Sequence, residues 1–170
     1  FPAAHPTMDT HQSHHHDGKR VEDLRLITGT GCFAADWNMP GQLYAHFVRS
    51  DHAHAEIVSV DTARARAHPG VVHIFTGEDA VRAGYVKAQN ALSAFPGRNG
   101  MKPRVLDRPV LAHGKVRFAG EAVVMVVADS AAAAADAAEL VEIQYRELPA
   151  ITNGEAALAP GAPQLDEAVP

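Results

Sequence analysis

The sequence of 170 residues contains a single cysteine, Cys32. One thiol excludes an internal disulfide, a four-cysteine zinc site and a cysteine-bound iron–sulfur cluster on this chain alone. No apolar run approaches the roughly 18 residues of a membrane-spanning helix. Positive charge is not in excess, because 15 Lys and Arg oppose 20 Asp and Glu for a net charge of −5. The sequence therefore predicts neither nucleic acid nor a membrane as partner, since both require a basic face.

What is present is the composition of an ordinary globular chain, with 46% hydrophobic and 21% charged residues. The length predicts one domain with its own core, at roughly 150 residues per domain. Residues 1–19 hold five of the 11 histidines and show no apolar period. We expect a flexible His-rich arm over 1–19, a folded domain over 20–153 and an extended tail over 154–170. The arm has no signal-peptide pattern, and we expect a cytoplasmic protein.

Alternating hydrophobicity and turn residues predict a series of short elements after residue 41. Strands are expected over 42–50, 55–61, 71–75, 109–112, 122–128 and 141–148, and helices over 63–67, 77–83 and 131–140. The run AVVMVVA at 122–128 is typical of a strand buried on both faces. The order of strand, helix and strand over 122–148 predicts a βαβ-like C-terminal half. The fold class is therefore mixed α/β (α+β) with a mixed β-sheet.

Residues 85–107 contain prolines and glycines but no clean period. They predict a loop of roughly twenty residues, which is long for a compact domain. Two interpretations stay open: a loop that faces an active site or an interface, or a mobile insertion.

A loose dinucleotide-binding pattern, Gly29-x-Gly31-x-x-Ala34, occurs near the start of the domain. The nucleotide fingerprint needs a strand before it and a long helix after it, and the sequence predicts neither. A glycine-bearing turn is the favoured interpretation. Cys32 has no neighbouring Lys or Arg to stabilise a thiolate, so structural burial is favoured over catalysis.

Histidines are the candidate metal ligands of the sequence. The adjacent imidazoles of His14, His15 and His16 could bind zinc, nickel or copper, although an arm without a structural metal is favoured. His52 and His54 lie two residues apart and are expected on one face, where hydrogen bonding is favoured over a metal site.

Ser50, Asp51 and His52 are adjacent in the chain and therefore cannot form a catalytic triad. Glu121 follows Gly120 at a strand entry, where its carboxylate could accept backbone N–H groups or an inter-domain arginine. We assign no catalytic, cofactor-binding or metal-binding residue. The candidate interface residues are Arg49, Ser50, His52, His54, Gly120 and Glu121.

Several segments in a fixed order resemble one known family. They read RVEDLRLITGTGCF (20–33), GQLYAHFVRS (41–50), AHAEI (53–57), AHPGV (67–71), TGED (76–79), VRFAGEAVV (116–124) and YRELP (145–149). Over about residues 20 to 168 the chain resembles the amino-terminal α/β-hammerhead domain of the large subunits of xanthine dehydrogenase, aldehyde oxidase and carbon monoxide dehydrogenase. These enzymes are molybdenum hydroxylases.

The resemblance implies a non-catalytic part of an oxidoreductase, either a small split subunit, a fragment or a cloned domain. It implies an aldehyde or N-heteroaromatic substrate and a scaffolding role for this chain. Molybdopterin, iron–sulfur clusters and FAD are expected on partner chains: a molybdopterin-binding catalytic chain, an iron–sulfur chain and a flavin chain. The alternative is a stand-alone binding module whose His-rich arm recruits a metal.

Overall fold

The computed structural model describes residues 20, 22–85, 98–100 and 109–165 of the chain. The chain divides into two compact units, Phe1–Pro40 and Gly41–Pro170, which are described separately. Within the described residues, no helix is long and apolar enough to cross a membrane.

The first unit contains two short helical turns, α1 (Asp23–Ile27) and η1 (Ala34–Asp36). The turn at Gly29 to Gly31 thus follows a helix rather than a strand, and only η1 comes after it. This context lacks both the strand and the long helix of a nucleotide site, as expected. The expected burial of Cys32 is wrong, because its side chain is exposed. The described residues of this unit form no core, since none of them is buried.

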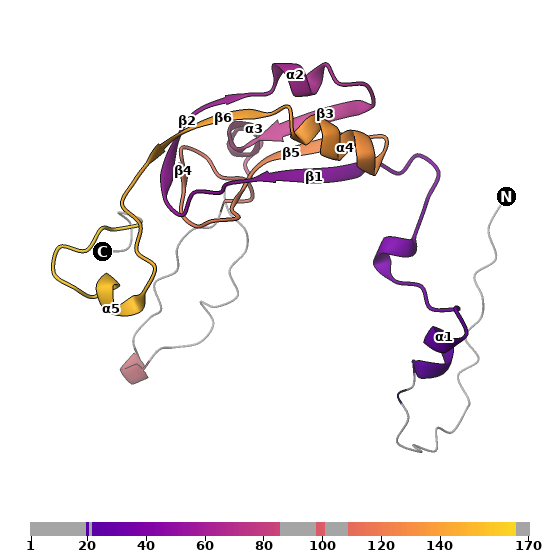
Figure 1. Ribbon diagram of the computed structural model, residues 1–170, viewed down its shortest axis with the longest axis horizontal. Coiled ribbons are helices and arrows are strands. Elements are labelled where there is room, and N and C mark those ends of the chain that lie inside the picture. Colours follow the sequence, from indigo (N-terminus) through magenta and orange to yellow (C-terminus); the bar gives the residue numbers. More distant parts are fainter. Residues whose placement is uncertain (1–19, 21, 86–97, 101–108, 166–170) are drawn as a thin grey trace. The chain divides into compact units, whose positions relative to one another are not determined.

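The second unit is built on two three-stranded antiparallel sheets (Figure 1). The first sheet has the order β1-β5-β3, from β1 (Tyr44–Arg49), β5 (Ala122–Ala128) and β3 (Val71–Thr76). The second has the order β4-β2-β6, from β4 (Lys115–Val116), β2 (Ala55–Asp61) and β6 (Glu142–Glu147). The most apolar strand, β5, is the central strand of its sheet and pairs with both neighbours.

The strand–helix–strand order of the C-terminal half is present, but its two strands belong to different sheets. β5 pairs in the first sheet, α4 (Ala131–Ala138) follows, and β6 pairs with β2 in the second sheet. The mixed α/β class is confirmed, whereas the predicted βαβ-like crossover within a mixed sheet is wrong. The local pattern identifies strands, but the choice of partner depends on β2, which lies far away in the sequence.

α4 packs against the strands of the first sheet (Figure 1). Ser130 begins the helix, and its hydroxyl accepts the N–H of the residue three positions on, at 3.2 Å. Ala134, Ala137 and Ala138 are buried at helical spacing. Their small side chains allow the helix backbone to approach the sheet closely. Ala137 and Ala138 belong to the core that includes Ile74, Val124 and Val126.

The remaining elements are α2 (Ala63–Arg66), α3 (Gly77–Arg82), η3 (Arg98–Gly100) and α5 (Gly154–Ala157). The predicted strand over 109–112 is wrong, because these residues join no strand ladder. The tail is not wholly extended either, since Asn153 caps α5 by accepting the Ala156 N–H at 2.7 Å. Most of the predicted loop over 85–107 lies outside the described residues.

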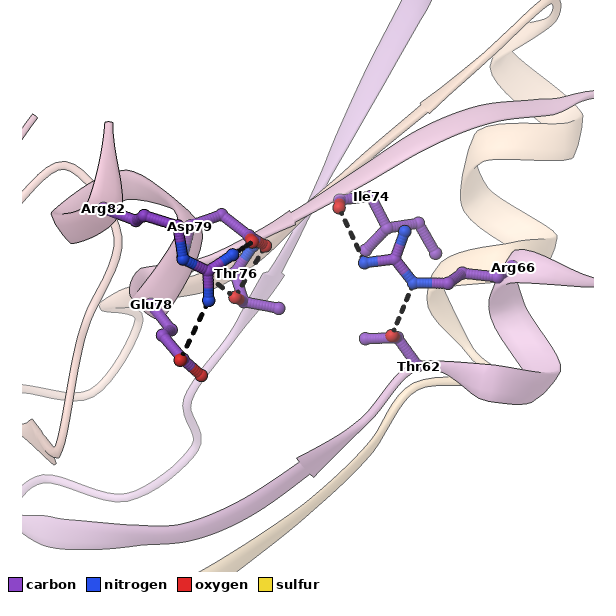
Figure 2. A network of polar contacts seen from close by, with 7 residues as sticks. All are labelled: Thr62, Arg66, Ile74, Thr76, Glu78, Asp79 and Arg82. Atoms are coloured by element: carbon purple, nitrogen blue, oxygen red, sulfur yellow. Dashed lines mark hydrogen bonds and ion pairs between the residues drawn. The ribbon is translucent and has the colours of Figure 1, made fainter.

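Two polar networks hold β3 in place (Figure 2). Within the strand, the Ile74 carbonyl oxygen accepts from Arg66 of α2, which also donates to the Thr62 hydroxyl, each at 3.0 Å. At the end of the strand, the Thr76 N–H donates to the Asp79 carboxylate at 2.9 Å, and the Asp79 N–H donates to the Thr76 hydroxyl at 3.3 Å. This reciprocal capping box begins α3. The N–H and hydroxyl of Thr76, and Arg82 nearby, lower the pKa of Asp79 below its ordinary value of 3.8.

We expect Asp79→Asn to lower the free energy of unfolding by about 1 kcal/mol at neutral pH, the usual value of a helix cap. Because the pKa of Asp79 is lowered by folding, its carboxylate stabilises the fold fully above the ordinary pKa of 3.8. That contribution is lost as the pH falls from this value through the lower pKa of the folded state. Urea unfolding at several pH values should show the difference between variant and wild type shrinking under acid. Asp136→Asn, on the exposed side of α4, is the matched control and should change little at any pH.

Candidate functional site

The six predicted interface residues meet at the turn that carries the chain from β1 to β2. The Ser50 N–H donates to the Glu121 carbonyl oxygen at 2.9 Å, and the Gly120 N–H donates to the Ser50 carbonyl oxygen at 2.7 Å. The Arg49 guanidinium donates to the Gly120 carbonyl oxygen at 2.8 Å. These bonds continue the pairing of β1 with β5 beyond the end of β1. They join two segments, 49–54 and 120–121, which lie far apart in the sequence.

Glu121 is a buried carboxylate, with only 5% of its surface exposed. It accepts the Arg117 backbone N–H at 2.6 Å, one of the two partners that the sequence suggested. Its own N–H donates to the Phe118 carbonyl oxygen at 3.2 Å. A hydrogen bond to a charged group contributes about 1.5–3 kcal/mol, so this contact stabilises the turn over 117–121.

His54 is equally buried and connects the turn to the end of β6. Its Nδ1 lies 2.8 Å from the Pro149 carbonyl oxygen, which can only accept, so Nδ1 carries the proton. Its backbone carbonyl oxygen accepts the Leu148 N–H at 2.9 Å. His54 therefore uses its ring as a structural donor. In the described part of the chain, no group of three or more His, Cys, Asp or Glu side chains could hold a metal ion.

His52 lies closer to the surface of the same turn. Its ring packs against Tyr145 with the ring centroids 4.7 Å apart. Its nitrogens lie 3.5 Å from carboxylate oxygens of Asp51 and Glu147. Burial raises the pKa of the Tyr145 hydroxyl, and the Ser50 side chain nearby opposes that shift. The Ser50 hydroxyl also accepts the backbone N–H of His52 at 3.1 Å, so Ser50 forms part of a turn and not of a triad.

The six residues thus divide into a buried and an accessible set. Ser50, His54 and Glu121 are buried within the chain. Arg49 is exposed, and His52 and Gly120 are half-buried. We call these six residues the corner. The corner contains hydrogen bonds that fix a shape and no nucleophile–base pair, so what it offers chemically is a rigid polar surface.

Comparison with known proteins decides the family. The family model for the aldehyde oxidase and xanthine dehydrogenase a/b hammerhead domain matches residues 28–149. The chain belongs to this family. The match contains the whole corner and the six strands that the structure describes.

Curated relatives extend the similarity along the chain. The large chain of carbon monoxide dehydrogenase from Afipia carboxidovorans is 42% identical over 149 residues, which are 88% of this chain and 17% of that one. The 6-hydroxypseudooxynicotine dehydrogenase complex subunit gamma of Paenarthrobacter nicotinovorans is 43% identical over 141 residues, 82% of this chain and 17% of that one. The hammerhead chain therefore spans about a sixth of the length of these relatives.

Solved structures show the same family similarity. Quinoline 2-oxidoreductase from Pseudomonas putida 86 superposes with a TM-score of 0.70 at 42% identity, over 82% of this chain and 17% of that one. A Cu,Mo-CO dehydrogenase gives a TM-score of 0.72 at 39% identity, over 89% of this chain and 18% of that one. The hammerhead fold is thus shared with known oxidoreductases. The alternative of a stand-alone binding module is not favoured by these matches.

The sequence did not predict two partners of the corner residues in this hammerhead domain: the Tyr145 ring and the Pro149 carbonyl oxygen. The alternation in VEIQYREL places Tyr145 on the same side as Ile143, which indicates burial. The Pro149 contact is made by a backbone carbonyl oxygen. No residue type marks this atom as the partner of His54, so the sequence carries no signal for it.

Proposed function

We propose that this hammerhead chain is the scaffolding part of a molybdenum-cofactor-dependent hydroxylase or dehydrogenase, acting on an aldehyde or an N-heteroaromatic compound. The observation that supports this proposal most strongly is the match of the family model to residues 28–149. Support for the substrate class comes from relatives named for pseudooxynicotine and quinoline compounds. Support for the metal comes from a relative named as the xanthine dehydrogenase molybdenum-binding subunit.

The cofactors belong, in this proposal, to partner chains or to a further part of the same enzyme. A molybdopterin centre would hydroxylate a carbon of the substrate with oxygen from water and pass electrons to iron–sulfur and flavin centres. The described residues include no group of three or more His, Cys, Asp or Glu side chains that could hold a metal ion, and their single thiol is Cys32. We therefore assign this chain no step of the reaction.

The role of this chain is to hold and contact the molybdopterin-binding part. The buried residues Ser50, His54 and Glu121 fix the corner, and the accessible Arg49 and His52 offer donors to a partner. Asp51 adds a carboxylate that is 88% exposed in its side chain. A rigid turn with exposed charges of both signs suits recognition, since little ordering entropy is lost on binding. The loop over 85–107 is a second candidate contact.

We expect the charge reversal Asp51→Arg to weaken the assembly about tenfold, because it replaces an exposed carboxylate by a second positive side chain beside Arg49. The measurement is the amount of molybdenum-binding polypeptide that co-purifies with this chain from cells producing both. Asp136→Arg, an identical exchange on the exposed side of α4, is the control and should retain the partner. Equal retention by the two variants would remove the corner from the interface.

A further inference from the structure

An apolar groove of about 500 Å³ lies on the first sheet, beside the corner, since the Arg49 guanidinium carbon lies 5.7 Å from the centroid of the Phe47 ring that lines the groove. Its floor consists of side chains from all three strands, and one wall is formed by Ala80 of α3 and by Ala83 directly after it. Tyr85 and Val110 border it at the ends of two described segments. A concave site of this size with mainly apolar walls is typical of a place that receives another group.

The strand register explains why the floor is apolar. Phe47, Met125 and Phe75 are aligned across β1, β5 and β3 in one row. The adjacent row, two residues along, contains Val127 and His73, and the His73 ring lies 4.3 Å from the Phe75 ring. Side chains two residues apart on a strand share a face, so both rows lie on one side of the sheet.

That side is the opposite one from α4. On β5, the core residues Val124 and Val126 alternate with Met125 and Val127. Val124 and Val126 belong to the same core as Ala137 and Ala138 of α4, whereas Met125 and Val127 are only half-buried. Phe47 and Phe75 consequently remain 39% and 38% exposed. Yet the run AVVMVVA has the composition of a strand that is buried on both faces. The sequence of β5 thus matches a sheet with a cover on its second face.

We propose that this groove receives an apolar segment of the molybdenum-binding part of the enzyme. The inference rests on the proposed function, because it takes its partner from there. The relatives are about six times longer than the matched region, so the family supplies a large additional body of chain next to this domain. The segment presents an aliphatic or aromatic side chain that inserts between Phe47 and Phe75. It carries no acidic residue at the rim, because the Asp79 carboxylate lines the groove there.

The test introduces a negative charge into the floor of the groove in the assembled enzyme. Phe47→Asp and Phe75→Asp should each reduce the co-purified molybdenum-binding polypeptide at least tenfold, because a buried carboxylate would face the apolar segment. Val58→Asp is the matched control: it puts the same charge on β2, at a side chain that is 59% exposed and outside the groove, and it should retain the partner. Circular dichroism of each variant checks that it is folded.

A second measurement avoids mutation. Hydroxyl-radical footprinting of the wild-type chain should show Phe47, Phe75 and Met125 reacting several-fold more slowly in the assembly than in the chain alone. Unchanged reactivity, or groove variants that retain the partner like Val58→Asp, would overturn the inference while leaving the proposed function intact. A wild-type chain that retains no molybdenum-binding polypeptide would overturn both. A dimer of the chain alone that Phe47→Asp dissociates would assign the groove to a second copy and also overturn the inference.

Discussion

Replacing Gly77 by alanine should lower the free energy of unfolding by about 3 kcal/mol, because one methyl group must enter a site already filled by backbone. Gly77 is buried at the start of α3. A Cβ built there would contact the Ala112 carbonyl oxygen and lie 2.7 Å from its carbonyl carbon. Backbone atoms cannot rotate away, so α3 and the segment at 111–113 must separate. A thermal melt should show a midpoint lower by about 10 °C, at 2–4 °C per kcal/mol for a chain of this size.

Gly154→Ala is the matched control for this substitution. Gly154 begins α5, and a Cβ built there meets nothing within 4 Å. Its substitution should change the free energy of unfolding by less than about 0.5 kcal/mol. If the two alanine variants had the same melting temperature, α3 would not approach the Ala112 backbone as closely as described.

Removing the Glu121 side chain should lower the free energy of unfolding by about 2–3 kcal/mol. Glu121→Ala leaves the Arg117 N–H without the acceptor that now lies 2.6 Å away, in a turn that is mostly shielded from water. Glu121→Gln keeps an acceptor oxygen and should cost about 1 kcal/mol, since a neutral acceptor makes the weaker bond. Chemical denaturation of the three proteins measures both losses.

Glu139→Ala serves as the control for loss of a carboxylate, because Glu139 is exposed at the end of α4. It should leave the stability close to that of the wild type. Should Glu121→Ala behave in the same way, the buried carboxylate would not anchor the corner. The predicted order of stability is therefore Glu139→Ala, then Glu121→Gln, then Glu121→Ala.

The elements of this hammerhead domain that the sequence predicts well are those with a strong local signal. The predicted strand over 122–128 has the same bounds as β5, because an uninterrupted apolar run leaves one choice. The helix predicted over 131–140 is α4 over Ala131–Ala138, because Ser130 marks its start and alanine favours its length. α1 was not predicted, since its five residues include no capping side chain.

What the sequence could not provide is the pairing of distant segments. The assignment of β5 and β6 to separate sheets depends on β2, not on the residues between them. The corner residues were identified as candidates, but the bond from Arg49 to Gly120 joins positions 71 residues apart. The groove could not be predicted from the sequence either, because Phe47, Met125 and Phe75 are aligned only once the three strands are in register. The fold class and family follow from motifs, whereas the site geometry requires coordinates.

The central claim is that this hammerhead chain works within a molybdenum hydroxylase, and metal analysis of the native assembly tests it most directly. The assembly is captured through this chain from the cells that produce it, and its molybdenum is quantified by inductively coupled plasma mass spectrometry. The account predicts molybdenum in stoichiometric amount, carried on polypeptide outside residues 1–170. An assembly with neither molybdenum nor any larger partner would contradict it.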